Sequence, residues 1–398
     1  TAIKLTFTFD GSNFEGKTLV AFEKLYDMDN RLVGNHENPD DKEQTVTVPK
    51  IRTTFVGENG LHVVKGGADA LTLIDTVSYE NLVPGKTYTL NGVLMGKNTG
   101  EKVICTVSGG DEEIIASTVF TPDTPNGTVD VVFTVPVPYA SVDGGDGLSD
   151  MSLVAFETLV NAEAKTVAAH EDIKDEGQTI YIVSIGTSLK DANNYKEFNA
   201  TGKITVIDTV TYRNLIPGTK YTVKGTLMNK ATGEAAVDAS GSTITAETSF
   251  TPNTADGTIN LPFTFNASNM EGVSLVAFEQ LFSGEAEIAD HKDLEDKDQT
   301  VTFPKVRTTA ADANGEKEFN ATGKLTIIDK VTYENLIPGT KYTVKGTLMD
   351  KDAGKAAVDA SGKEITAEAT FTPATASGSV NLSFTFNASN MEGKSLVA

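Results

Sequence analysis

Residues 198–228 read FNATGKITVIDTVTYRNLIPGTKYTVKGTLM, and residues 319–349 repeat them as FNATGKLTIIDKVTYENLIPGTKYTVKGTLM. A more divergent copy, ALTLIDTVSYENLVPGKTYTLNGVLM, occupies residues 70–95. Apolar and polar residues alternate within each copy, and Val, Ile and Thr are frequent, which is typical of half-buried β-strands. The Pro-Gly pair in each copy predicts a turn between two strands. Because the copies return at long intervals, we expect an array of similar units.

A second block sets the boundaries of these units. It reads TLVAFEKL at residues 18–25, SLVAFETL at 152–159 and SLVAFEQL at 274–281, and a His, an acidic stretch and a Gln follow each time. The Gln residues lie 134 and then 121 positions apart. We therefore divide the chain into residues 1–49, the C-terminal part of a truncated unit; residues 50–183 and 184–304, two complete units; and residues 305–398, the N-terminal part of a truncated unit.

The regular spacing of short strands predicts an all-β fold of tandem Ig-like antiparallel β-sandwich domains. The junctions between units, such as residues 47–54 (TVPKIRTT), are very short. Short junctions restrict bending, so we expect the array to form a rod.

Composition excludes several classes of function. Asp plus Glu number 55 against 33 Lys plus Arg, and the net charge of −22 repels nucleic acid and anionic membranes. A single Cys rules out an internal disulfide framework. The sequence has no Cys/His spacing typical of a metal site and no Gly-rich phosphate loop, so we expect no metal and no cofactor. It has no initiator Met or signal peptide, and we expect it to be a segment of a longer protein.

Five residue types recur at fixed positions in the repeat. Three of the four His residues each lie eight positions before a Gln, and an Asp follows a Thr after 21 or 22 positions. The set comprises Thr53, Asp75, Glu157, His170 and Gln178 in the first complete unit and Thr187, Asp208, Glu279, His291 and Gln299 in the second. Glu23, His36 and Gln44 represent it in the N-terminal part, and Thr308 and Asp329 in the C-terminal part.

Each of these residues also has an ordinary structural interpretation. Strand alternation allows the Asp and the Glu to face solvent, and duplication alone preserves neutral residues. A buried carboxylate, in contrast, is costly and is usually paired, protonated or functional. Because the whole set returns in both complete units although their loops differ, we favour a function for the set.

The chemistry open to this set is narrow. A Thr hydroxyl is a weak nucleophile until a base takes its proton, and His is a natural base near neutral pH. Attack on a Gln carboxamide requires stabilisation of the developing oxyanion, which a protonated carboxylic acid can provide. The product would be a Thr–Gln ester that joins the first and last strands of a unit, with release of ammonia. The reaction occurs once per unit, so we do not expect a turnover enzyme.

These motifs resemble the T-Q ester bond domains, or VaFE repeats, of Gram-positive surface adhesins. The resemblance covers essentially the whole chain and implies an autocatalytic intramolecular ester assisted by a His and two acidic residues. It implies a Thr53–Gln178 bond with Asp75, Glu157 and His170 as helpers, and a Thr187–Gln299 bond with Asp208, Glu279 and His291 as helpers. Thr54, Ser188 and Thr309 adjoin the chosen Thr residues, and the choice rests on the resemblance. Neither terminal part holds a full set.

The resemblance also implies a biological role, namely the stalk of a cell-wall-anchored, extracellular adhesin. The expected partners are the neighbouring repeats, the cell wall through a region C-terminal to this chain, and a host ligand through a separate tip domain. The alternatives are an adhesin module that binds a host protein or glycan, and a Thr-His-Asp hydrolase. A Lys–Asn isopeptide is the chemical rival, but the first strands of the units offer no Lys at the position of the Thr.

Overall fold

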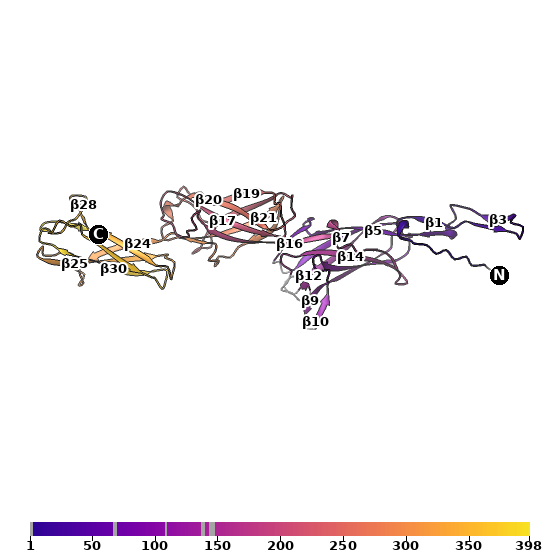
Figure 1. The fold of residues 1–398 in the computed structure, drawn as a ribbon, viewed down its shortest axis with the longest axis horizontal. Coiled ribbons are helices and arrows are strands. Elements are labelled where there is room, and N and C mark those ends of the chain that lie inside the picture. Colours follow the sequence, from indigo (N-terminus) through magenta and orange to yellow (C-terminus); the bar gives the residue numbers. More distant parts are fainter. Residues whose placement is uncertain (1–2, 67–69, 108–109, 137–139, 143–147) are drawn as a thin grey trace.

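The computed structural model describes residues 3–66, 70–107, 110–136, 140–142 and 148–398. Regular structure in these residues consists of β-strands and a few short 3-10 helices. Successive units follow one another along the long axis of the molecule (Figure 1). The predicted all-β fold of tandem sandwiches in a rod is confirmed. Within the described residues, no helix has the length and apolar character needed to cross a bilayer.

The elements follow the repeat. The N-terminal segment contains η1 (Ser12–Phe14), β1 (Thr18–Val20), β2 (Glu23–Tyr26), β3 (Leu32–His36), η2 (Lys42–Gln44) and β4 (Thr45–Thr47). The first complete unit contains β5 (Lys50–Gly57), β6 (Val63–Lys65), β7 (Leu71–Glu80), β8 (Tyr88–Gly96), β9 (Val103–Val107), β10 (Gly110–Glu113), β11 (Ile115–Phe120), β12 (Gly127–Val135), β13 (Ala140–Val142), β14 (Ser152–Asn161), β15 (Thr166–His170) and η3 (Glu176–Gln178). Strand β16 (Thr179–Lys190) continues into the second complete unit.

The rest of the second unit contains β17 (Lys203–Arg213), β18 (Tyr221–Asn229), β19 (Thr245–Phe250), β20 (Gly257–Asn266), η4 (Ala267–Asn269), β21 (Ser274–Ser283), β22 (Ala286–His291) and β23 (Thr300–Thr302). The C-terminal part contains β24 (Lys305–Ala311), β25 (Lys324–Glu334), β26 (Tyr342–Thr347), β27 (Met349–Asp350), β28 (Lys355–Ala356), β29 (Thr366–Phe371), β30 (Gly378–Asn387) and β31 (Leu396–Val397).

Each complete unit is a sandwich of two sheets. In the first unit β12-β7-β5 faces a sheet that contains β11, β8 and β14, and in the second β20-β17-β16 faces β19-β18-β21-β22. Along β7 every second residue from Leu71 to Tyr79 is buried, as the alternating sequence predicts. Phe55, Leu73 and Phe133 meet Leu90 and Leu94 in a core between the two sheets. A side chain at an inward position of these strands therefore lies between two layers, away from water.

Strand β16 joins the two complete units without a break. Its first residues pair with β14 of the first unit, and Ser184–Lys190 pair with β17 of the second. At the other two junctions the strand is divided, and Pro49 and Pro304 occupy the positions equivalent to Val183. Proline has no N–H to donate to a sheet, so its absence at residue 183 allows one strand to serve both units.

The terminal parts are incomplete sandwiches. Residues 305–398 form the three-stranded sheet β24-β25-β30 and short pieces of the opposite sheet. The N-terminal segment forms only two-stranded pairs, β1 with β4 and β2 with β3. Ile3, Leu5, Phe7 and Phe9 are each more than half exposed there. The segment therefore has little core of its own.

Candidate functional site

Both sheets contribute to one site in the first complete unit. Thr53 and Asp75 lie on neighbouring strands β5 and β7, and Glu157 lies on β14 in the opposite sheet. The β14–β15 register places His170 directly across from Glu157. Gln178 ends η3, and its Nε2 donates to Glu157 Oε2 over 2.5 Å. The strand order thus brings together residues that are up to 125 positions apart.

The second unit brings the same residue types together, and here the Thr hydroxyl is hydrogen-bonded to the Glu, whereas the Thr53 hydroxyl of the first unit is unpaired. Gln299 Nε2 donates to Glu279 Oε2 over 2.8 Å, and Thr187 Oγ1 donates to the same oxygen over 3.2 Å. His291 lies across from Glu279 in the β21–β22 register. A single carboxylate oxygen therefore contacts both the hydroxyl and the amide that the sequence analysis paired.

The acidic residues and the Gln of both sets are fully buried. Asp75, Glu157, Gln178, Asp208, Glu279 and Gln299 all have 0% exposure. The outward-facing alternative for the Asp and Glu positions is therefore wrong in both complete units. Each Glu lies opposite a glycine of the adjacent strand, Gly92 or Gly225. A Cβ at either glycine would come within 2.5 Å of a core Phe ring, so only glycine allows the core to close beside the Glu.

Burial sets the protonation of the two carboxyl groups. It raises the pKa of Glu157 and Glu279, and the nearby Asp75 and Asp208 raise it further. Burial also raises the pKa of Asp75 and Asp208, although the neighbouring Glu side chains oppose that rise. Two carboxyl groups so close in an apolar interior do not both ionise, and the pair therefore retains a proton near neutral pH.

Several polar atoms at the site have no hydrogen-bond partner among the described residues. They are the Thr53 hydroxyl, both carboxyl oxygens of Asp75, one carboxyl oxygen each of Glu157, Asp208 and Glu279, and the carbonyl oxygens of Gln178 and Gln299. Unpaired buried polar atoms are costly and uncommon in proteins. An ester between Thr53 and Gln178 would remove the unpaired hydroxyl group of Thr53 from this set, while the carbonyl oxygen of Gln178 would remain as the carbonyl oxygen of the ester.

The structure adds an acidic residue that the sequence analysis missed. His170 Nε2 lies 2.9 Å from Asp175 Oδ2, and His291 Nε2 lies 2.9 Å from Asp296 Oδ2. Burial raises the pKa of each of these Asp residues, but hydrogen bonds from the His and from backbone N–H groups outweigh it, so the net shift is downward. The sequence could have revealed this residue, because an Asp lies three positions before each Gln. In the N-terminal part, that Asp is Asp41.

This Asp also shapes the turn that presents the Gln. Asp175 Oδ1 accepts from Gly177 N over 2.8 Å and caps η3, the short helix that ends at Gln178. Asp41 plays the same role for η2, where Oδ1 accepts from Glu43 N. One carboxylate thus fixes both the His ring and the Gln turn.

The geometry distinguishes between the neighbouring hydroxyl residues. Thr53 has a buried hydroxyl, whereas Thr54 is an exposed residue. Thr187 contacts Glu279, whereas Ser188 offers its backbone N–H to Asp208 Oδ1 over 3.1 Å. Both pairs favour the first residue as the nucleophile.

The terminal parts contain separate pieces of the site. Glu23 pairs with His36 across β2 and β3, and His36 Nε2 lies 2.6 Å from Asp41 Oδ2. At the other end of the chain, Asp329 is 3% exposed, and burial raises its pKa, which the Thr308 side chain opposes.

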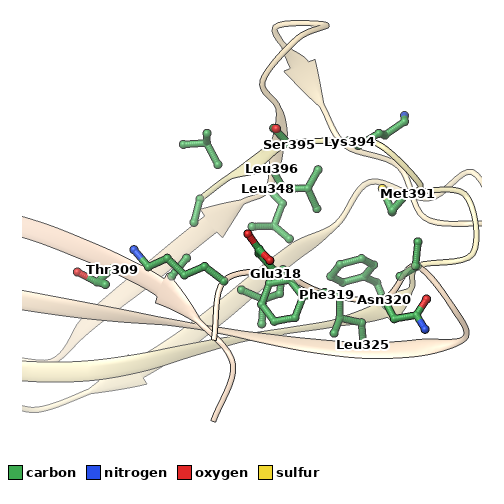
Figure 2. A pocket seen from close by; sticks show the side chains of 18 of the residues that line it. Thr309, Glu318, Phe319, Asn320, Leu325, Leu348, Met391, Lys394, Ser395 and Leu396 are labelled. Carbon is green, nitrogen blue, oxygen red and sulfur yellow. The ribbon is translucent and has the colours of Figure 1, made fainter. Parts of the chain in front are cut away.

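Thr308 borders a cavity of about 670 Å³ in residues 305–398. Figure 2 shows the apolar side chains of Phe319, Leu325, Leu348 and Met391 around this cavity. Of β21–β23, only the start of β21 has a counterpart here: the short strand β31 pairs with β27 as β21 pairs with β18. The described residues of this part hold no counterpart of the rest of β21, which carries Glu279, or of β22 and β23. The cavity therefore marks the part of the sandwich that those strands fill in the second unit.

No group of three or more His, Cys, Asp or Glu residues in the described part of the chain is arranged to hold a metal ion. Cys105 is a buried residue of the core.

Comparison with known proteins gives matches that coincide with the repeated units. A family model described as "T-Q ester bond containing domain" matches four consecutive segments, residues 1–48, 49–182, 183–303 and 304–398. No curated protein matches the chain. Similar solved structures include a bacterial adhesin from Mobiluncus mulieris containing intramolecular disulfide, isopeptide and ester bond cross-links, with 16% identity over 67% of this chain and 88% of that chain and a TM-score of 0.26. Another is a glycosyl hydrolase family 2 member from Bacteroides cellulosilyticus, with 11% identity over 55% of this chain and 26% of that chain and a TM-score of 0.21. Structural likenesses this weak carry no conclusion about the present chain.

Proposed function

The chain belongs to the T-Q ester bond domain family, and from this premise we propose that it is a stalk segment of a cell-wall-anchored surface adhesin whose complete units are each locked by a Thr–Gln ester. The observation that carries the proposal is the contact of Glu279 Oε2 with both Thr187 and Gln299. The two reacting groups are held within reach of one proton acceptor, inside a buried site. Each complete unit modifies itself once, and the chain is not a turnover enzyme.

The geometry supports a short proton relay. Burial and the nearby Asp208 raise the pKa of Glu279, so the shared proton of the carboxyl pair rests on the Glu, and its transfer to Asp208 leaves the Glu ionised. Glu279 then accepts the hydroxyl proton as Thr187 Oγ1 attacks Cδ of Gln299, and returns that proton to Nε2, which it also contacts. The C–N bond breaks and ammonia leaves, so a hydroxyl and an amide become an ester and ammonia.

The Asp and the His have supporting roles in this scheme. Gln178 Oε1 carries negative charge in the tetrahedral intermediate, and the protonated carboxyl of Asp75 is the natural donor to it because both groups are buried and unpaired. His170 is held by Asp175 and lies directly across from Glu157. The His is therefore a fixed neighbour of the carboxyl pair in this scheme, and the Glu, rather than the His suggested by the sequence, takes the proton of the Thr.

The positions of the two esters explain why such a chain suits a stalk. Gln178 lies immediately before the continuous strand β16, and Thr187 lies within that strand, nine positions further along the chain. A pulling force along the chain is therefore transmitted from one ester to the next through the nine positions of chain from Gln178 to Thr187. The 124 residues between Thr53 and Gln178 lie outside this path. The proposed partners are the neighbouring repeats, with the cell wall and a host ligand contacted by regions outside this chain.

Intact-mass measurement tests the proposal. We expect the purified chain to weigh less than its sequence by two molecules of ammonia, one for each complete unit. Thr53→Ala and Thr187→Ala should each restore one loss, whereas Thr54→Ala, next to the first nucleophile, should keep both. Hydroxylamine should cleave the denatured chain at the ester and would spare an isopeptide amide. A chain with the full sequence mass would overturn the proposal.

A further inference from the structure

One asparagine recurs at the same place in three successive units. Asn81, Asn214 and Asn335 follow the Tyr at the end of β7, β17 and β25 in the Tyr-x-Asn-Leu turn. All three have left-handed backbones, with φ of 66°, 59° and 62°. Asn tolerates this conformation better than most residues, but glycine tolerates it best. The backbone alone therefore does not explain why each turn carries an amide side chain.

The amide of each asparagine reaches the preceding unit. Asn81 Nδ2 donates to Lys17 O over 2.8 Å, and Asn335 Nδ2 donates to Gly272 O over 2.5 Å. Asn214 Nδ2 donates to both Met151 O and Ile182 O, over 2.8 and 3.0 Å. These acceptors come from the stretch just before the LVAFE block and, for Ile182, from the strand that leaves the unit. The same edge of each unit thus accepts the turn of the next.

The side-chain oxygen of the asparagine also accepts a hydrogen bond from the preceding unit at two of these contacts. Thr18 Oγ1 donates to Asn81 Oδ1 over 3.0 Å, and Ser152 Oγ donates to Asn214 Oδ1 over 3.0 Å. Meanwhile the backbone N–H of Asn214 is held by Asp256 of its own unit over 2.9 Å. The residue is therefore anchored to its own unit through the backbone and to the preceding unit through the side chain.

Ion pairs lie next to the asparagine contacts. Where one partner of such a pair is replaced at a contact, the other partner is replaced as well. Arg52 pairs with Glu15 over 3.0 Å, and Arg307 pairs with Glu271 over 2.5 Å. At the middle contact Gly186 and Ser149 replace both partners of this pair. A different pair is present there.

The pair at the middle contact is formed by residues at other positions, and its positive charge stands where the other units have a negative one. Arg213 lies 3.8 Å from Asp150, at the position where the other two units have Glu80 and Glu334. Ser184 also donates to Asp150. An ion pair between the two units is therefore present at all three contacts, although different residues form it at the middle one. Complementary charges of this kind help to fix how two surfaces meet.

We propose that the asparagine of the Tyr-x-Asn-Leu turn is the connector that docks each unit onto the backbone of the preceding unit and fixes the angle between them. The amide is suited to this role because its NH₂ group bonds two carbonyl oxygens while its oxygen accepts a hydroxyl. The partner surface is the edge formed by residues 16–18 and 48 in the N-terminal segment, and its equivalents in the later units. This inference does not depend on the ester.

Small-angle X-ray scattering of the full chain tests the proposal. The first variant replaces Asn81, Asn214 and Asn335 together by Gly, which keeps the left-handed backbone and removes the amide. The second replaces them by Asp, which keeps the shape and places an acceptor against the carbonyl oxygens. Asn194→Gly is the matched control, because Asn194 also has a positive φ of 68° but lies in a turn within the second unit.

We expect both triple variants to lose the scattering curve of a single extended conformer, with a smaller radius of gyration and a broader distribution of interatomic distances. The control should scatter as the unmodified chain does, and far-ultraviolet circular dichroism should be the same for all. If the Gly variant scatters as the unmodified chain does, the proposal is overturned. The amide would then not be needed, and the asparagine would contribute only its left-handed backbone to the turn. Loss of the β spectrum in both triple variants would also overturn it, because a connector is not needed for the core of each unit.

Discussion

At the scale of single residues, the site depends on one buried carboxyl group in each complete unit. In the second unit, Glu279 Oε2 is hydrogen-bonded to both Thr187 and Gln299. Its strand position follows from alternation, and its burial follows from the glycine beside it. The relay therefore predicts that the acid–base function of this group, and not its size, is required.

Glu279→Gln tests that requirement. The variant keeps the shape of the side chain but cannot accept and return a proton, so we expect the second unit to form no ester while the first forms its own. Intact mass should then show the loss of one ammonia instead of two. Glu247→Gln, an exposed Glu on β19 of the same unit, is the control and should show both losses. Two losses in Glu279→Gln would remove the Glu from the relay.

The raised pKa of the buried Glu predicts a pH dependence of stability before cross-linking. A carboxyl whose pKa is higher in the folded state stabilises that state below its unfolded pKa, and this contribution is lost as the pH rises toward the folded value. In the chain with Thr53→Ala and Thr187→Ala, the free energy of unfolding should therefore fall from pH 5 to pH 9. Each unit of pKa shift is worth about 1.4 kcal/mol. Urea unfolding at the two pH values measures the change.

The control is the same chain with Glu157→Gln and Glu279→Gln added. Because Gln does not titrate, most of the fall in stability between pH 5 and pH 9 should disappear. An equal fall in both chains would show that other groups cause the pH dependence.

At the scale of strands and turns, the ester closes a long loop between the first and last strands of a unit. The loop spans 125 residues in the first unit and 112 in the second. In the chain-entropy model a covalent link around a loop of this length stabilises the fold by about 5 kcal/mol. Thr53→Ala should therefore lower the melting temperature of the first unit, as measured by calorimetry. Thr54→Ala should melt as the unmodified chain does, and an unchanged melting temperature in Thr53→Ala would contradict the stabilising role.

The strands were predictable from sequence to different degrees. Alternation along the chain was sufficient to predict the strands and the sandwich, and the repeat singled out residues that the structure brings together in each complete unit. The continuity of β16 was not foreseen, since it depends on the absence of a proline at residue 183. The role of Asp175 was also missed, because the stretch from Glu171 to Glu176 offers several acidic residues and only the fold selects the one that reaches His170.

At the scale of the whole molecule, the two proposed esters predict how the chain responds to force. A complete unit with its ester formed should not lengthen under tension, because the link bypasses its fold. Without the ester, the first unit should release 125 residues. That release amounts to about 400 Å at the full reach of an extended chain.

Single-molecule pulling on the full chain measures this difference. Thr53→Ala should add one extension step of this size, and Thr54→Ala should add none. A step of this size in the unmodified chain would contradict a closed first unit.

The terminal parts predict a second kind of product. Neither holds a full set of site residues, so we expect no ester within either. Between chains, however, Thr308 of one copy can meet Gln44 of another if the exposed N-terminal segment enters the cavity of residues 305–398. Denaturing gels should then show a covalent ladder, and Thr308→Ala should remove it while Thr309→Ala keeps it. A ladder that survives Thr308→Ala would exclude this pairing.

The complete burial of the Gln and its neighbours has a chemical consequence for the lifetime of the proposed bond. Esters are ordinarily saponified in alkaline solution, but hydroxide must first reach the carbonyl carbon, and here a closed, acidic molecule surrounds it. Saponification then has to wait for the sandwich to open. Its rate in mild alkali would serve as a clock that records how often each unit opens.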